Sequence, residues 1–120
     1  MRHLIDFGDL PREEWDELYA RAERIMDAPA QYLDACRGKV MASLFYEPST
    51  RTNFSFQTAM LRLGGTVFGF ADPKSSSTAK GESLKDTIKM VAGYADVVVM
   101  RTPWEGAAKA ASLYLSLIHI

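Results

Sequence analysis

Apolar residues recur at helical spacing in the first part of the chain. Over residues 11–27 this spacing is carried by Trp15, Leu18, Tyr19, Ala22, Ile25 and Met26. Steps of three and four place side chains on one side of a helix, so this segment is predicted to form an amphipathic helix. Pro11 suits the first turn of such a helix.

Three later runs have a different pattern and are predicted to be strands. They are residues 39–46 (KVMASLFY), 66–71 (TVFGFA) and 96–101 (DVVVMR). The first and third are continuous and mostly apolar, without the polar alternation of a half-exposed strand, which is typical of strands buried in a sheet.

Helical spacing returns after each of these runs. Helices are predicted over residues 50–63, 83–92 and 105–114, the first ending at the Gly64-Gly65 pair. The order α-β-α-β-α-β-α predicts an α/β fold, with a parallel sheet, right-handed crossovers and helices on both faces. In such sheets ligands bind beyond the carboxyl ends of the strands.

Composition narrows the possible functions. The chain has 120 residues, 48% of them hydrophobic, so one soluble domain is expected. Its formal charge of -1 gives no overall positive potential that would attract nucleic acid or an anionic membrane. One cysteine, Cys36, cannot form an internal disulfide, and the first residues lack the features of a signal peptide. A cytoplasmic location is therefore expected.

Candidate ligand-binding residues follow all three predicted strands. Ser49, Thr50, Arg51 and Thr52 follow the first, Ser76 and Lys80 follow the second, and Arg101 ends the third. A strand-to-helix turn offers free N–H groups and a helix dipole, and an arginine grips two oxygens at once, so the first turn is predicted to bind phosphate.

Each of these residues also has an ordinary interpretation. Ser49 or Thr50 can be a helix cap, and Arg51, Lys80 and Arg101 can be solvated surface residues. Their convergence on one edge of the predicted sheet favours an anion site. The sequence has neither the GxxxxGK[ST] nor the GxGxxG pattern that would support nucleotide binding.

At this point the motifs resemble a known family. The run 45–52 (FYEPSTRT), then Ser55-Phe56 and Leu63-Gly64-Gly65, is similar to the carbamoyl-phosphate motif of aspartate and ornithine carbamoyltransferases. The similarity continues through KGESL (80–84) and, after Arg101, through EGAA (105–108). Glu47-Pro48 and the Lys80 before Gly81 resemble the aspartate enzymes. Asn53 and Gln57 depart from the family, which commonly has Arg and Glu there.

The resemblance implies transfer of the carbamoyl group from carbamoyl phosphate to L-aspartate, giving N-carbamoyl-L-aspartate and phosphate, in pyrimidine biosynthesis. It implies that residues 49–52 bind the phosphate, that Arg51 stabilises the leaving phosphate, and that Thr52 and Arg101 contact the carbamoyl oxygen. Ser76 and Lys80 are implied to reach the site of a neighbouring subunit in a homotrimer. No metal or organic cofactor is implied, and Glu47 matches a position that assists domain closure.

The resemblance also implies parts that this sequence lacks. Residues 1–114 match an incomplete carbamoyl-phosphate-binding domain, with a fourth strand missing or replaced and the aspartate-binding domain absent. Residues 115–120 (LSLIHI) do not resemble the family and are interpreted as an artefact rather than a native strand. Neither His3, expected at the surface, nor His119 is assigned to catalysis, and the chain alone is expected to be inactive. An ornithine-type transferase and a non-catalytic anion-binding module stay open as alternatives, as does the presence of regulatory chains.

Overall fold

A computed structural model describes residues 3–71 and 83–114 of the chain. Its helices and strands follow the predicted order: α1 (Arg12–Asp27), β1 (Val40–Phe45), α2 (Thr50–Arg62), β2 (Thr66–Phe70), α3 (Leu84–Ala92), β3 (Val97–Arg101) and α4 (Ala107–Tyr114). Two short 3-10 turns, Phe7–Asp9 and Pro29–Tyr32, were not predicted. The element ends lie within two residues of the predicted ones, the usual uncertainty at frayed ends.

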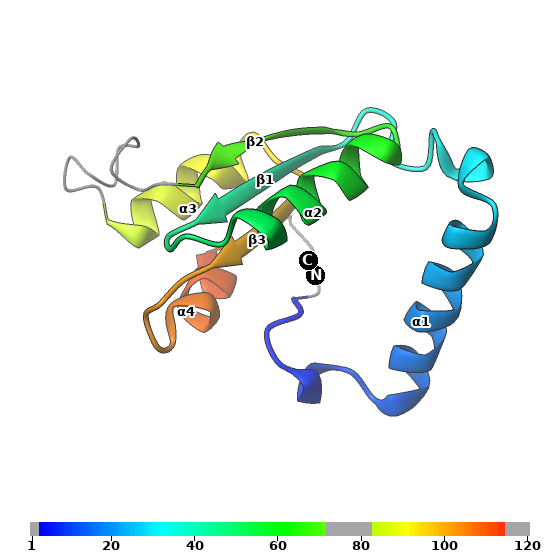
Figure 1. The fold of residues 1–120 in the computed structure, drawn as a ribbon. Coiled ribbons are helices and arrows are strands. Elements are labelled where there is room, and N and C mark those ends of the chain that lie inside the picture. The colour runs from blue at the N-terminus through cyan, green and yellow to red at the C-terminus, as the bar shows by residue number, and fades with distance from the viewer. Residues whose placement is uncertain (1–2, 72–82, 115–120) are drawn as a thin grey trace.

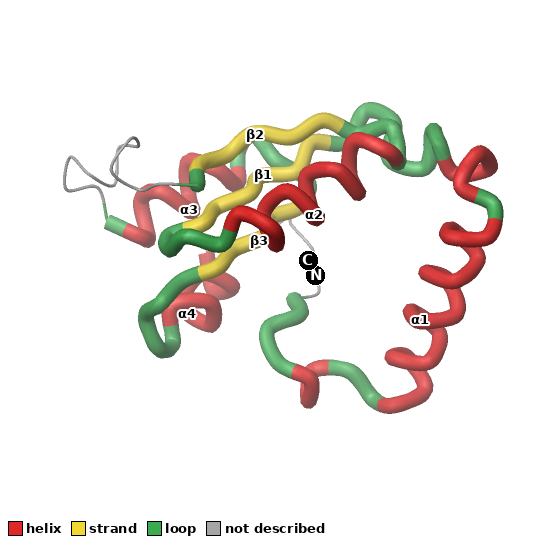
Figure 2. The backbone as a smooth tube through the Cα atoms, viewed as in Figure 1, coloured by secondary structure: helices red, strands yellow, loops and turns green. Residues whose placement is uncertain are grey.

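The three strands form one parallel sheet in the order β2-β1-β3. Helix α2 covers one face, and α3 and α4 cover the other (Figures 1 and 2). The predicted α/β class, with a parallel sheet and helices on both faces, is therefore confirmed. The central strand β1 is buried along nearly its whole length, as its unbroken apolar run predicts.

Alternate residues of β1 enter two separate cores. Ala42 and Leu44 pack with Ile88 of α3, on the face that α3 and α4 cover. Met41 and Phe45 pack with Met60 of α2 on the other face. This alternation follows from the two-residue period of a strand, and it fixes which side chains at the strand's end face α2.

Local signals in the sequence set several element ends. Ser83 caps α3, since its hydroxyl accepts a hydrogen bond from the N–H of Asp86 at 3.1 Å. Gly64 follows α2 at φ 88°, a conformation that glycine adopts without steric cost. An alanine there would overlap the backbone carbonyl of Leu33.

The turn before α1 holds one perturbed carboxyl group. The N–H groups of Ile5 and Asp6 donate to Oδ2 of Asp9 at 2.6 and 2.9 Å. These bonds favour the ionised form, so the Ile5 bond first and the Asp6 bond second lower the pKa of Asp9 below its ordinary value.

Helix α1 stands away from the sheet (Figure 1). None of its residues is buried, and Leu18, Tyr19 and Met26 are exposed although the sequence predicts an apolar helix side. The predicted amphipathic helix thus forms without covering the sheet. Within residues 3–71 and 83–114, no helix is both long and apolar enough to cross a membrane.

Candidate anion-binding site

The topology brings the ends of β1 and β3 together. The chain leaves β1 through α2 to reach β2 on one side, then returns through α3 to β3 on the other side. The carboxyl ends of β1 and β3 therefore flank the point at which the strand order reverses, where ligands bind in open α/β sheets. Phe45 pairs with Arg101, and the N–H of Tyr46 donates to the carbonyl of Arg101 at 2.8 Å.

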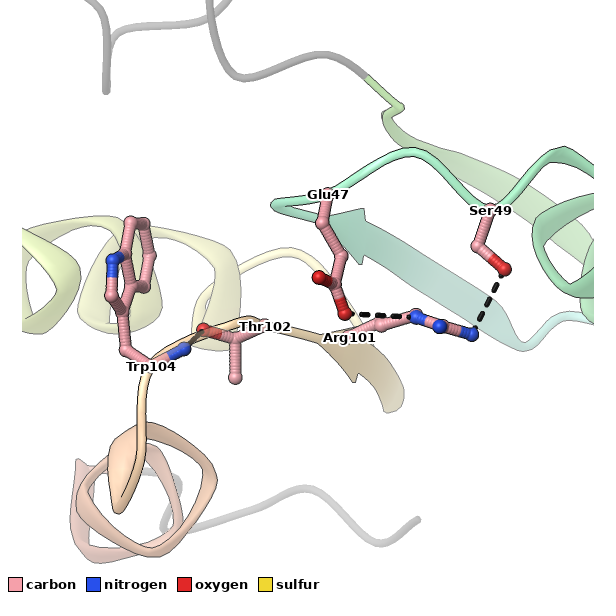
Figure 3. Close-up of polar contacts among 5 residues, drawn as sticks. All are labelled: Glu47, Ser49, Arg101, Thr102 and Trp104. Carbon is pink, nitrogen blue, oxygen red and sulfur yellow. Dashed lines mark hydrogen bonds and ion pairs between the residues drawn. The ribbon is translucent and has the colours of Figure 1, made fainter.

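Arg101 reaches from β3 toward the turn that follows β1. Its Nε donates to Oε1 of Glu47 at 3.0 Å, and its Nη1 donates to the Ser49 hydroxyl at 2.9 Å (Figure 3). Arg101 pairs in register with Phe45, whose side chain packs on the α2 side, so the guanidinium also lies on that side. The predicted convergence of the first and third strand ends is present in the structure.

Residues 49–52, which we call the cradle, form the N-terminus of α2. Ser49 is the N-cap residue, but its hydroxyl accepts from Arg101 and makes no capping hydrogen bond to the helix. The N–H groups of the first helical turn therefore receive no bond from this cap, and the helix dipole adds partial positive charge there. Thr52 is half-buried, whereas Thr50 and Arg51 are exposed to solvent.

A groove of about 680 Å³ opens beside the cradle. Glu47, Thr52 and Arg101 supply polar groups to its lining, and the residues of β3 and α4 make much of its wall apolar. His3 is half-buried and lines the same groove, whereas the sequence predicted a surface position for it. Polar groups that converge in an apolar hollow are typical of small-molecule sites.

The loop after β3 is held by contacts of its own. The N–H of Trp104 donates to the Thr102 hydroxyl at 3.2 Å (Figure 3), and the Trp104 ring lies 5.2 Å from the ring of Tyr46. Tyr46 also meets Phe70 edge to face at 5.0 Å. These aromatic contacts connect the ends of all three strands on the face opposite the cradle, and they restrain the chain that leaves Arg101.

The predicted site residues divide into two groups. The structure brings Ser49, Thr52 and Arg101 together, with Thr50 and Arg51 on the same helical turn. Ser76 and Lys80 lie outside the described residues. Within the described part of the chain, no cluster of three or more His, Cys, Asp or Glu side chains could hold a metal ion.

Sequence reasoning missed two features of this site. It did not predict that the carboxylate of Glu47 pairs with Arg101. It also treated Asn53 and Gln57 as separate departures, although their side chains are hydrogen-bonded to each other at 2.8 Å. Their spacing of four residues on a predicted helix was the available signal.

The fold and the site together define a doubly wound α/β domain with a candidate anion-binding site at its topological switch point. Comparison with known proteins identifies the family to which this domain belongs. A family model described as aspartate/ornithine carbamoyltransferase, carbamoyl-P binding domain, matches residues 2–118. Because the match covers nearly the whole sequence, the chain belongs to the aspartate/ornithine carbamoyltransferase family, in the region of its carbamoyl-phosphate-binding domain.

Individual relatives agree with this assignment. The chain is 58% identical over 113 residues to the aspartate carbamoyltransferase catalytic subunit of Clostridium perfringens, covering 94% of this chain and 37% of that protein. Against the same subunit of Clostridium acetobutylicum the identity is 54% over 116 residues, covering 97% and 38%. The chain thus spans a little over a third of the length of these relatives.

Solved structures give the same result. The catalytic subunit of M. jannaschii aspartate transcarbamoylase superposes with a TM-score of 0.91 at 49% identity, covering all of this chain and 41% of that one. Aspartate transcarbamoylase from Trypanosoma cruzi, in complex with carbamoyl phosphate and aspartate, superposes with a TM-score of 0.72 at 40% identity, covering 86% and 33%.

Proposed function

We propose that this chain binds carbamoyl phosphate at the cradle and belongs to an aspartate carbamoyltransferase. The observation that carries the proposal is the Arg101 guanidinium, which bonds to the Ser49 hydroxyl at 2.9 Å beside the N-terminus of α2. One cation, the hydroxyls of the cradle and a helix N-terminus then face one small volume. This combination suits a phosphate carrying a carbonyl group.

The proposed chemistry is carbamoyl transfer to L-aspartate. The aspartate amine attacks the carbamoyl carbon, a C–N bond forms, the C–O bond to phosphate breaks, and the proton lost by the amine leaves with the phosphate. Negative charge develops on the carbonyl oxygen and on the departing phosphate. Thr52 and Arg101 would stabilise the first charge and Arg51 the second, since fixed donors lower the barrier where charge develops. Ser49, Thr50 and Arg101 would hold the phosphate, Arg101 through a guanidinium N–H other than the one that reaches the carbonyl oxygen.

L-Aspartate is favoured over ornithine as the acceptor by the relatives and by two sequence signatures. The related chain from T. cruzi was solved with carbamoyl phosphate and aspartate, and the C. perfringens relative is named an aspartate enzyme. Glu47-Pro48 and Lys80 agree with that choice. The product would be N-carbamoyl-L-aspartate, an intermediate of pyrimidine biosynthesis in the cytoplasm.

The proposed working unit is a homotrimer with shared active sites. Ser76 and Lys80 would enter the site of a neighbouring subunit, and residues 1–114 would form the carbamoyl-phosphate-binding domain. Since aspartate would bind elsewhere in the complete protein, residues 1–120 alone are proposed not to catalyse transfer. Carbamoyl-aspartate formed by the purified chain, free of host enzyme, would contradict this.

Calorimetric titration tests the binding proposal. The purified chain is titrated with carbamoyl phosphate and with inorganic phosphate, together with an Arg51→Ala variant and an Arg21→Ala control on α1. We expect saturable binding that Arg51→Ala abolishes and Arg21→Ala leaves unchanged. Equal losses in both variants would mean that general positive charge, and not the cradle, attracts the anion.

A further inference from the structure

A buried polar cluster lies beneath the cradle, between β1 and α2. The Ser43 hydroxyl donates to Oδ1 of Asn53 at 2.7 Å, and Nε2 of Gln57 donates to the same oxygen at 2.8 Å. Ser43 and Asn53 are 1% and 3% exposed, and Gln57 is half-buried. We call these three residues the Asn53 triplet.

Asn53 connects the cradle to the sheet through two different groups. Its backbone N–H donates to the carbonyl of Ser49 at 2.9 Å, a hydrogen bond in the first turn of α2. Its side chain accepts from Ser43, in the middle of β1. A shift of this turn relative to the strand would therefore break a buried hydrogen bond, and a buried polar group without a partner is costly.

The triplet joins α2 to the sheet by a hydrogen bond, whereas the far end of α2 meets the sheet through apolar side chains. Near the other end of the helix, Met60 packs against Met41 and Phe45 of the sheet through apolar contacts, and the hydrogen bond there, from the Cys36 N–H to the Leu63 carbonyl at 2.7 Å, comes from the chain before β1 and not from the sheet. Apolar contacts are non-directional, so they hold a helix on a sheet without fixing its rotation closely. Hydrogen bonds depend on direction as well as distance. The hydrogen bond between the Asn53 side chain and the sheet lies at the end of the helix that carries the cradle.

The triplet also explains the two departures from the family pattern together. Asn53 and Gln57 stand where the family commonly has Arg and Glu, and here the two side chains touch. Both side chains are neutral, so the pair carries no net charge beneath the cradle. A charged residue at one of the two positions alone would leave an unpaired charge in a largely buried cluster, which is destabilising.

We propose that Asn53 is a positioning residue for the anion site. Through the triplet it fixes the distance of the first turn of α2 from the sheet and the rotation of that turn about the helix axis, so that the cradle and Arg101 contact the same phosphate. This role rests on the proposed function, because the cradle must bind phosphate for its position to matter. Asn53 itself does not touch the ligand.

The test compares Asn53→Ala with Met60→Ala, both at buried positions of the same helix. Inorganic phosphate is titrated calorimetrically into each folded variant. Misplaced binding groups lose affinity steeply, so we expect Asn53→Ala to weaken binding about tenfold or more and Met60→Ala less than about twofold. Equal affinity of Asn53→Ala and the wild type overturns the proposal, and so does an equal loss in Met60→Ala.

Ser43→Ala gives the same test if Asn53→Ala does not fold. It leaves Asn53 in place and removes only the link to β1, so phosphate binding should weaken while the cradle sequence is intact. The effects of Ser43→Ala and Asn53→Ala should not add, because both remove the same link. Additive losses, or unchanged binding in Ser43→Ala, would contradict the positioning role.

Amide hydrogen exchange separates this proposal from the proposed function. If the wild-type chain does not bind phosphate, the proposed function fails, but the mechanical role of the triplet is still measurable. We expect Ser43→Ala to speed exchange of the Asn53 amide at least about fivefold more than that of the Leu63 amide, at the far end of α2. Equal acceleration at both ends means that the triplet does not position the cradle.

Discussion

Replacing Glu47 by glutamine should strengthen phosphate binding. The glutamine side chain would keep the carbonyl oxygen that accepts from Arg101 but remove the charge that competes with the anion for the guanidinium. The side chains of Arg101 and Glu47 are 47% and 34% exposed. Ion pairs this accessible contribute about 0.2–1 kcal/mol, so releasing the pair should raise phosphate affinity by about 1.4- to 5-fold.

A second effect acts in the same direction. The carboxylate of Glu47 repels an incoming phosphate, and Glu47→Gln removes that repulsion too. Both effects are electrostatic and partly exposed to solvent, so the gain should shrink as salt is raised from about 0.1 to about 1 M.

The assay is calorimetric titration with inorganic phosphate at the two salt concentrations. Glu17→Gln is the matched control, because it makes the same charge change in an exposed ion pair with Arg21 on α1, away from the sheet. Weaker binding in Glu47→Gln would refute the reasoning, and would mean that the carboxylate orients Arg101 rather than competing for it. An equal gain in phosphate affinity in Glu17→Gln would mean that the change in net charge alone, and not the release of Arg101, causes the effect.

Three further predictions concern the sheet, the triplet and the N-terminal turn. Gly69→Ala should lower the free energy of unfolding, measured by urea titration, by about 3 kcal/mol or more, because the added Cβ would overlap the backbone of β1. Gly38 is also at positive φ but in open space, so Gly38→Ala should lower the same free energy by only about 1 kcal/mol. Asn53→Arg and Gln57→Glu should each lower the melting temperature, and the double variant should recover most of that loss, so additive losses would argue against coupling. Asp9→Ala should be less stable than the wild type at pH 7. Because backbone hydrogen bonds lower the pKa of Asp9, that difference should shrink as pH falls below the ordinary value of 3.8, and a difference constant with pH would exclude the carboxylate as its source.

The strands and the site edge could be predicted because their signals are local. The unbroken apolar run of β1 indicates burial on both faces, and the order of elements then requires parallel strands whose carboxyl ends meet. Ser49 and Arg101 are far apart in sequence, yet both stand at strand ends, so the rule for open α/β sheets was enough to place them together.

Contacts between particular side chains could not be predicted in the same way. The pairing of Glu47 with Arg101 depends on the path of the turn after β1, which the periodicity of strands and helices does not specify. The position of α1 could not be predicted for a similar reason. Its amphipathic pattern predicts a helix with one apolar side but does not say which surface that side meets, and the sheet proved not to be that surface.

The central claim is that the cradle and Arg101 bind one phosphate together. It is tested most directly by following backbone amide and arginine Nε resonances while inorganic phosphate is added to the isotope-labelled chain. The account predicts that the amides of Thr50, Arg51 and Thr52 and the Nε of Arg101 shift together and saturate at one dissociation constant. Saturation of the cradle amides without any change at Arg101, or shifts spread over the basic residues of α1, would contradict it.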